Sequence, residues 1–258
     1  MRKLVACFDV IGDRVTKALQ FQDNIDVASA EEMALAMCVA QIDEIIFFDV
    51  TASNEKRPID IETVRKVATK ITIPLAVGGG IRNLDDMRDV FEAGACKVSV
   101  DSMAVRNPDI ITQAAKAFGP GRVILSTQVQ RGANTPSGYE VYIDGARTAT
   151  GMDAIEWIKK GEALGAGEIC LNSIDQDGTL TGYDIPLMKL AEEAVSIPLI
   201  ASGGAGKPEH LLEVFTQTRT EAAIISSMLY SPRMERNYTV KELKTYLSDK
   251  NVAVAPFS

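Results

Sequence analysis

Histidine, tryptophan and paired cysteines are scarce in this chain. It has one histidine, His210, one tryptophan, and four cysteines without a CxxC spacing. No cluster of metal-ligating residues surrounds His210, so we expect no metal and no other cofactor. Three of the cysteines lie in apolar strand-like runs, and we interpret all four as reduced core residues of a cytoplasmic protein. The cysteines are Cys7, Cys38, Cys96 and Cys170.

Positive charge and long apolar runs are also lacking. The chain has 27 Lys and Arg against 35 Asp and Glu, a net charge of -8, which argues against binding to nucleic acid. No run reaches the roughly 18 apolar residues of a membrane span, and the N-terminus lacks the form of a signal peptide. We therefore expect no membrane partner. With 46% hydrophobic residues, the 258 residues can form one large core, and we predict a single domain over 1–258.

What the chain has is a regular alternation of short apolar runs and amphipathic helical patterns. The runs are continuously apolar, which is typical of strands buried on both faces of a parallel sheet. Eight such units predict an α/β fold, a (βα)8 TIM barrel, with a doubly wound open sheet as the alternative. The predicted strands are 3–8, 44–48, 75–77, 97–100, 123–127, 168–171, 199–201 and 222–225. The predicted helices are 30–39, 61–69, 84–93, 109–117, 153–163, 185–193, 208–216 and 240–248.

The two halves of the chain resemble one another. Residues 73–81 and 197–206 are both short apolar runs that end in glycines and precede a helical pattern. Bare N–H groups at the start of a helix bind anions, so two such sites predict a ligand with a phosphate at each end. The repeat divides the barrel into half-barrels of about 1–120 and 121–258. We expect a bulky residue at Gly204 to weaken ligand binding and to leave folding largely intact.

Two connections are longer than a barrel requires. Residues 10–29 follow the first strand and residues 130–150 follow the fifth, and within the latter 138–145 has the pattern of a small β-hairpin. Both follow the C-terminal ends of strands, where the active sites of barrels lie. We therefore expect them to cover the site.

Acidic residues follow several strands. Asp9 closes the first and Asp49 the second, and Asp175 and Asp177 follow the sixth. A carboxylate in the mouth of a barrel is partly desolvated and can act as a general acid or base, although it can also cap a loop. We expect one of the acids after strand six to be structural. At the end of strand five stands Gln128, which cannot transfer a proton as a carboxylate does.

Distinctive motifs stand at residues 6–10, 49–53 with 55–57, 77–81, 173–179 with 182–184, and 201–207. Together these motifs resemble the cyclase subunits of imidazole glycerol phosphate synthase, over essentially the full length. The sister isomerase of the same pathway shares the barrel and phosphate sites but usually lacks Thr-Ala-Ser after strand two.

The resemblance implies an enzyme of histidine biosynthesis. In that family ammonia from a glutaminase subunit attacks a bis-phosphorylated ribulosyl intermediate, giving imidazole glycerol phosphate and an aminoimidazole carboxamide ribotide. Asp9 and Gln128 occupy the positions of the two catalytic aspartates, and Lys17 matches a lysine that closes over the substrate. The other implied contacts to substrate or phosphate are Asp49, Gly80, Asp101, Ser102, Asp177, Gly178, Gly204, Ser226 and Ser227.

Three positions depart from the family pattern. Gln128 replaces an aspartate, Asp101 replaces an asparagine, and the order of Gly12 and Asp13 is reversed. We expect Asp9 to be the principal acid/base group and Gln128 to act at most as a hydrogen-bonding positioner. Alternatives are a paralogue that works with an amidotransferase on amidinated surface sugars, a scaffold that activates a glutaminase, and a sister-type isomerase.

Four charged residues stand near the starts of strands: Lys3, Glu44, Lys97 and Glu168. They match the family's charged ring at the N-terminal face of the barrel, through which ammonia enters. The resemblance therefore implies an ammonia gate and a glutaminase partner on that face. Ordinary ion pairs on a solvated barrel bottom are the alternative.

Overall fold

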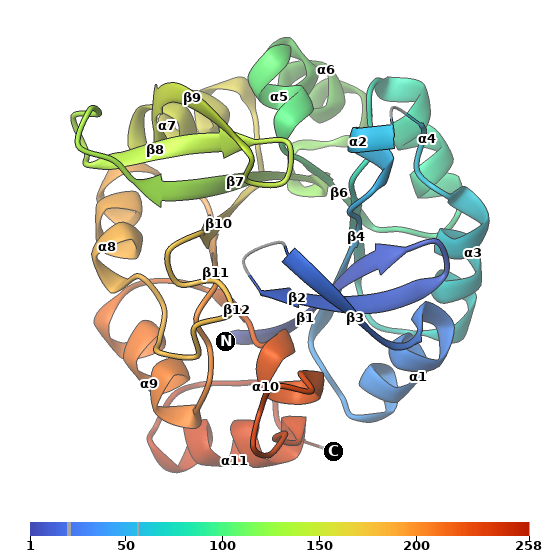
Figure 1. The fold of residues 1–258 in the computed structure, drawn as a ribbon, viewed down its shortest axis with the longest axis vertical. Coiled ribbons are helices and arrows are strands. Elements are labelled where there is room, and N and C mark those ends of the chain that lie inside the picture. The colour runs from blue at the N-terminus through green and yellow to red at the C-terminus, as the bar shows by residue number, and fades with distance from the viewer. Residues whose placement is uncertain (20–21, 56, 258) are drawn as a thin grey trace.

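A closed barrel of eight parallel strands forms the centre of the molecule (Figure 1). The computed structural model describes residues 1–19, 22–55 and 57–257. Each barrel strand pairs with the next, and the circle closes where the last strand pairs with the first. The predicted TIM barrel is confirmed, and the open-sheet alternative is wrong. The barrel strands are β1 (Lys3–Ile11), β4 (Glu44–Asp49), β5 (Leu75–Gly78), β6 (Lys97–Val100), β7 (Val123–Arg131), β10 (Glu168–Ser173), β11 (Leu199–Ser202) and β12 (Ala222–Ile224).

Helices surround the barrel (Figure 1). Most begin at a polar side chain that accepts a hydrogen bond from the first turn, as Asp60 does from the N–H groups of Glu62 and Thr63. No helix among the described residues is long and apolar enough to cross a membrane. The outer helices are α1 (Ala30–Val39), α3 (Ile61–Lys70), α4 (Leu84–Glu92), α6 (Asp109–Phe118), α7 (Ala154–Leu164), α8 (Ile185–Ala194), α9 (Pro208–Gln217) and α11 (Val240–Asp249). Shorter helices are α2 (Ala52–Glu55), α5 (Ser102–Arg106), α10 (Ser226–Tyr230) and the 3-10 helix Pro120–Arg122.

Two antiparallel extensions replace the expected long loops. After β1 the chain forms β2 (Arg14–Leu19) and β3 (Gln22–Ser29), and after β7 it forms β8 (Tyr139–Ile143) and β9 (Thr148–Asp153). The prediction of a complete hairpin over 138–145 is wrong. That segment supplies one strand, because its partners are the extended end of β7 on one side and β9 on the other.

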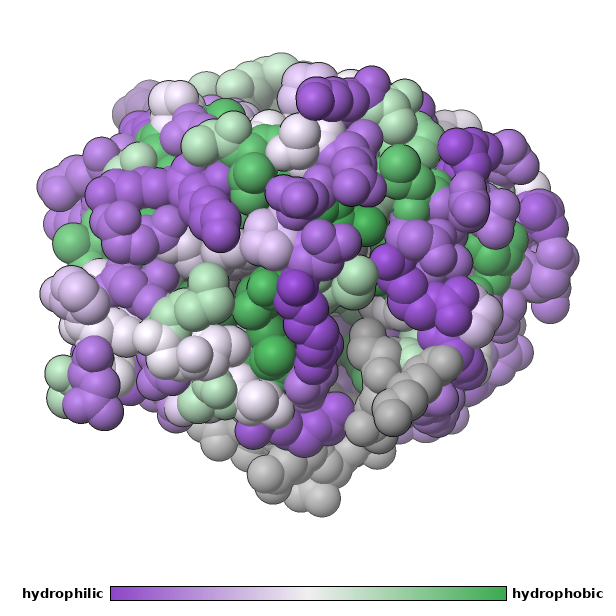
Figure 2. Space-filling model, turned by 90° about the horizontal axis from the view of Figure 1, so that it is seen from above, coloured by the Kyte–Doolittle hydropathy of each residue, from purple (hydrophilic) through white to green (hydrophobic). Residues whose placement is uncertain are grey.

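The barrel has a double core. Alternate residues of each strand point inward, so a compact apolar layer fills the barrel, while the opposite faces pack against the helices. The outer surface in Figure 2 is mostly hydrophilic, with apolar side chains in separate small patches. The inner layer consists of Val5, Ile46, Ala76, Ile124, Cys170, Ile200, Ala222 and Ile224.

Candidate active site

A polar layer lies at the C-terminal mouth of the barrel, above the apolar one. Its members stand two residues beyond inward-facing positions such as Cys7, Cys170 and Ile200, and therefore share the inner face. They lie on, or directly after, five different barrel strands, so the barrel itself brings them together. The layer consists of Asp9, Asp101, Gln128, Asn172 and Ser202.

Four members of this layer form a hydrogen-bonded chain. The hydroxyl of Ser202 donates to Oδ1 of Asn172 at 2.7 Å, and Nδ2 of Asn172 donates to Oε1 of Gln128 at 2.8 Å. Nε2 of Gln128 then donates to Oδ2 of Asp101 at 3.4 Å. Gln128 is thus held from both sides, and its expected role as a hydrogen-bonding positioner stays a prediction.

A second cluster gathers around Lys17 on β2. Its Nζ lies 4.0 Å from Oδ2 of Asp9, and the side chain is largely buried. Burial raises the pKa of Asp9, although Lys17 opposes that shift. Burial also raises the pKa of Asp177 to about 6, against Lys17 and together with the charge of Asp9. The extension after β1 therefore brings a lysine to two carboxylates with raised pKa values.

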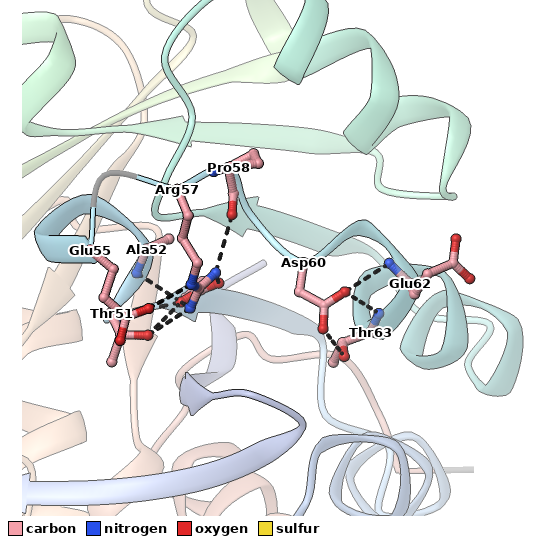
Figure 3. Close-up of polar contacts among 9 residues, drawn as sticks. Thr51, Ala52, Glu55, Arg57, Pro58, Asp60, Glu62 and Thr63 are labelled. Atoms are coloured by element: carbon pink, nitrogen blue, oxygen red, sulfur yellow. Dashed lines mark hydrogen bonds and ion pairs between the residues drawn. The ribbon is translucent and has the colours of Figure 1, made fainter.

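Asp49 anchors the loop that follows β4. Its carboxylate pairs with the guanidinium of Arg57 at 2.6 and 2.9 Å and accepts from the N–H of Ala52 at 3.0 Å. Figure 3 shows Arg57 turned back toward Thr51 and Ala52. With only 4% of its side chain exposed, Asp49 is used within the protein, and its contact with substrate stays a prediction.

Both glycine-rich strand ends contain two glycines in a row with a positive φ angle. Gly79 and Gly80 have φ values of 82° and 69°, and Gly203 and Gly204 have 92° and 99°. This left-handed region favours glycine, since other residues are strained there. After the next barrel strands, β6 and β12, the short helices α5 and α10 begin at Ser102 and Ser226, with Ser227 next in α10. Phosphate binding at these ends, and at Gly178, stays a prediction.

The two serines differ in what their hydroxyls do. Ser226 accepts from the N–H of Cys7 at 2.7 Å and donates to its carbonyl at 2.9 Å, so only its backbone N–H can serve a ligand. Ser102 accepts from the N–H of Asp144 at 2.9 Å, which leaves its hydroxyl hydrogen to donate. The two predicted phosphate sites are therefore not equivalent in their side chains.

Gly204→Ala is expected to destabilise the fold, by about 2–3 kcal/mol. A Cβ there would lie 1.9 Å from the carbonyl oxygen of Gly182, and the backbone angle is strained for alanine. The expectation that a bulky residue at Gly204 leaves folding intact is thus wrong. Urea unfolding measures the effect, with Gly119→Ala as a control that has the same strain of φ but open space. Equal losses of unfolding free energy in the two variants would argue against a clash at Gly204.

The four charged residues near the strand starts form one connected ion-pair chain at the opposite end of the barrel. Lys97 Nζ lies 2.8 Å from Oε1 of Glu44 and 2.7 Å from Oε1 of Glu168, and Lys3 Nζ lies 3.5 Å from Glu44. The pKa of Lys97 is raised, because the two glutamates outweigh its burial. The predicted grouping is present, and its action as an ammonia gate stays a prediction.

Known proteins match the chain along its length. Residues 3–235 match the family model of histidine biosynthesis proteins. A protein of Desulforapulum autotrophicum named imidazole glycerol phosphate synthase subunit HisF is 50% identical, over 98% of this chain and 97% of its own. HisF of Desulfatibacillum aliphaticivorans is 47% identical, also over 98% of this chain and 97% of its own. HisF of Nitratidesulfovibrio vulgaris is 46% identical, over 96% of this chain and 95% of its own. The chain belongs to the HisF family. The resemblance deduced from the motifs is confirmed.

Within this HisF-family chain, motif reasoning missed two functional candidates, Asn172 and Ser202. Both belong to the polar layer, and the period-two spacing from Cys170 and Ile200 could have identified them. The expectation of one structural acid after strand six applies to Asp175. Its Oδ2 accepts from the N–H of Arg131 at 2.8 Å.

Asp101→Asn is expected to stabilise the protein at pH 8, by roughly 1–4 kcal/mol. Burial raises the pKa of Asp101 to about 7 from the 3.8 of an ordinary aspartate. At pH values between 3.8 and about 7, the carboxyl group of Asp101 is deprotonated in the unfolded protein and protonated in the folded one. The free energy of unfolding therefore falls as the pH rises through this range. Urea unfolding of both proteins at pH 4 and pH 8 should show a gain only at the higher pH. Exposed Asp85→Asn is the control, and a less stable Asp101→Asn at pH 8 would contradict the argument.

Proposed function

We propose that the chain is the cyclase subunit of imidazole glycerol phosphate synthase, a lyase of histidine biosynthesis. It uses ammonia to close the imidazole ring of imidazole glycerol phosphate and releases aminoimidazole carboxamide ribotide. The observation that supports this best is the polar mouth layer, where Asp9 combines a raised pKa with a lysine 4.0 Å away. A partly buried carboxylate of this kind can give or take the protons that ring closure moves.

We propose that the substrate spans the mouth between the two glycine-rich strand ends, with one phosphate at each. Gly80, Asp101 and Ser102 border one end, and Gly204, Gly178, Ser226 and Ser227 border the other. Backbone N–H groups in left-handed turns and at helix starts can form anion sites of the size of a phosphate. Lys17, Asp49 and Asp177 complete the proposed substrate contacts.

We also propose a glutaminase partner on the N-terminal face. The relatives are named as subunits of a synthase, and the ion-pair chain of Lys3, Glu44, Lys97 and Glu168 lies at this end of the barrel interior. Opening it would admit ammonia into the barrel. The four free thiols support action in the cytoplasm. We further propose that residues 1–258 form one domain.

The test supplies the bis-phosphorylated ribulosyl intermediate and ammonium salt, and follows the loss of near-ultraviolet absorbance. Turnover in ammonium, with none in its absence, is expected. A HisH-type glutaminase partner with glutamine should replace the salt. No turnover at high enzyme in ammonium would refute the cyclase and favour a paralogue with another substrate, and isomerisation without ammonia would favour the sister enzyme.

A further inference from the structure

The reaction proposed above needs two proton-transferring groups, and the mouth layer offers a second carboxylate besides Asp9. Gln128, within β7, cannot exchange a proton, but its amide faces Asp101, which directly follows β6. We propose that Asp101 is the second acid/base residue of the site, and that Ser202, Asn172 and Gln128 position its carboxylate. This inference rests on the proposed cyclase function.

The hydrogen-bonded chain has a direction, and it ends at Asp101. Ser202 donates to Asn172, Asn172 to Gln128, and Gln128 to Asp101, at 2.7, 2.8 and 3.4 Å. Because Asn172 occupies the amide oxygen of Gln128, the amide N–H groups must face the carboxylate. Asp101 is thus the terminal acceptor. Among the side chains of Ser202, Asn172, Gln128 and Asp101, only the carboxylate of Asp101 can release or take a proton at ordinary pH.

The surroundings keep this carboxylate available. No ion pair to Asp101 is found among residues 1–19, 22–55 and 57–257, and Arg106 is bound to Asp144 instead, at 2.7 Å. Burial, aided by Asp144, raises the pKa of Asp101 to about 7, whereas Gln128 and Arg106 oppose the shift. The charge of Asp101 also acts on the thiol of Cys170 inside the barrel, whose own pKa burial raises to about 12. An acid/base group is most effective when its pKa lies near the working pH.

Two carboxyl groups suit the addition of ammonia to the ketone of the ribulosyl chain. The nitrogen lone pair forms the C–N bond while the carbonyl π bond breaks toward oxygen. One carboxyl group, in its acid form, gives a proton to that oxygen. The other, as carboxylate, takes one proton from the nitrogen, so the product is a neutral amino alcohol. Asp9 and Asp101 then hold exchanged protonation states, ready for the loss of water in the next step.

The first test compares Asp101→Asn with the wild type in the ammonium assay. We expect kcat to fall by about 10²-fold or more, with KM within threefold. The wild-type pH profile should show a group near pH 7 that the variant lacks. A residue that only borders a phosphate would behave otherwise, since removal of its negative charge would lower KM and spare kcat. A kcat within threefold of wild type would overturn the proposal.

Two further variants address position and fold. Gln128→Leu removes the donor that lowers the pKa of Asp101, so the limb near pH 7 should move to higher pH; an unmoved limb would overturn the positioning argument. Combining Asp101→Asn with isosteric Gln128→Glu moves the carboxylate to the neighbouring strand, and kcat of this double variant should be at least tenfold above that of Asp101→Asn alone. An unchanged kcat would argue that a carboxylate at position 128 cannot replace the one at position 101. Asp85→Asn controls for loss of a surface charge.

The outcomes separate this inference from the function beneath it. If the wild type fails to turn over in ammonium, the cyclase function and this inference fall together. If the wild type turns over and Asp101→Asn matches it, only the inference falls. Should Asp101→Asn fail to fold by circular dichroism, the pH limb of Gln128→Leu alone decides the assignment.

Discussion

Asp9→Asn is expected to lower kcat in the ammonium assay by about 10²–10⁴-fold, the usual contribution of one general acid or base. Asparagine keeps the volume of the side chain and its hydrogen-bonding oxygen but cannot exchange a proton. Asp9 lies at the mouth with a pKa raised by burial, and Lys17 is its nearest cation at 4.0 Å. The loss should therefore appear in kcat rather than in KM.

The control for this variant is Asp85→Asn, which makes the same chemical change at an exposed ion pair on α4 and should leave kcat unaltered. Thermal unfolding must show that Asp9→Asn is folded. Unchanged turnover would mean that Asp9 is structural. Asp177, whose pKa is raised to about 6, would then be the next candidate.

Lys97→Met is expected to destabilise the barrel by about 3–5 kcal/mol, measured by urea unfolding at pH 7. Lys97 lies 2.8 and 3.0 Å from the two oxygens of Glu44, whose side chain is 2% exposed. Methionine fills a similar volume, so the loss comes from leaving a buried carboxylate without its main partner.

Lys3→Met provides the matched control for that change. Lys3 lies farther from Glu44, at 3.5 Å, and is 48% exposed, so its removal should cost less than about 1 kcal/mol. The wild-type stabilisation by Lys97 is expected below pH 10.5 and should be lost as pH rises through the raised pKa of this lysine. Equal costs for the two variants would contradict a buried network.

Local patterns predicted the barrel well because its strands and helices follow from apolar spacing alone. The predicted strand 97–100 and helix 30–39 coincide with β6 and α1. The extension of β2 and β3 was missed, since residues 14–29 lack a glycine turn and alternate irregularly. Its strands owe their order to pairing with the end of β1, which no local pattern shows.

Asp9, Asp101 and Gln128 of the polar layer were singled out from the sequence, whereas Asn172, Ser202 and the contacts between these residues were not. Gln128 and Asn172 meet because β7 and β10 pair in a register that sets these two residues opposite each other. Likewise, the carbonyl of Gly182 approaches Gly204 from a different loop. Such contacts depend on distant segments of the chain, so strand ends alone cannot specify them.

The seam between β1 and β12 determines when a growing chain can become a barrel. Three residue pairs join these strands. The hydroxyl of Ser226 extends the seam, because it forms hydrogen bonds with both the N–H and the carbonyl of Cys7, which lies 219 residues away in the sequence. Until the ribosome has released β12, the flanks of β1 and β11 are both open edges that can pair with other chains. Slow exchange of the Cys7 amide hydrogen would therefore report the moment of ring closure during synthesis.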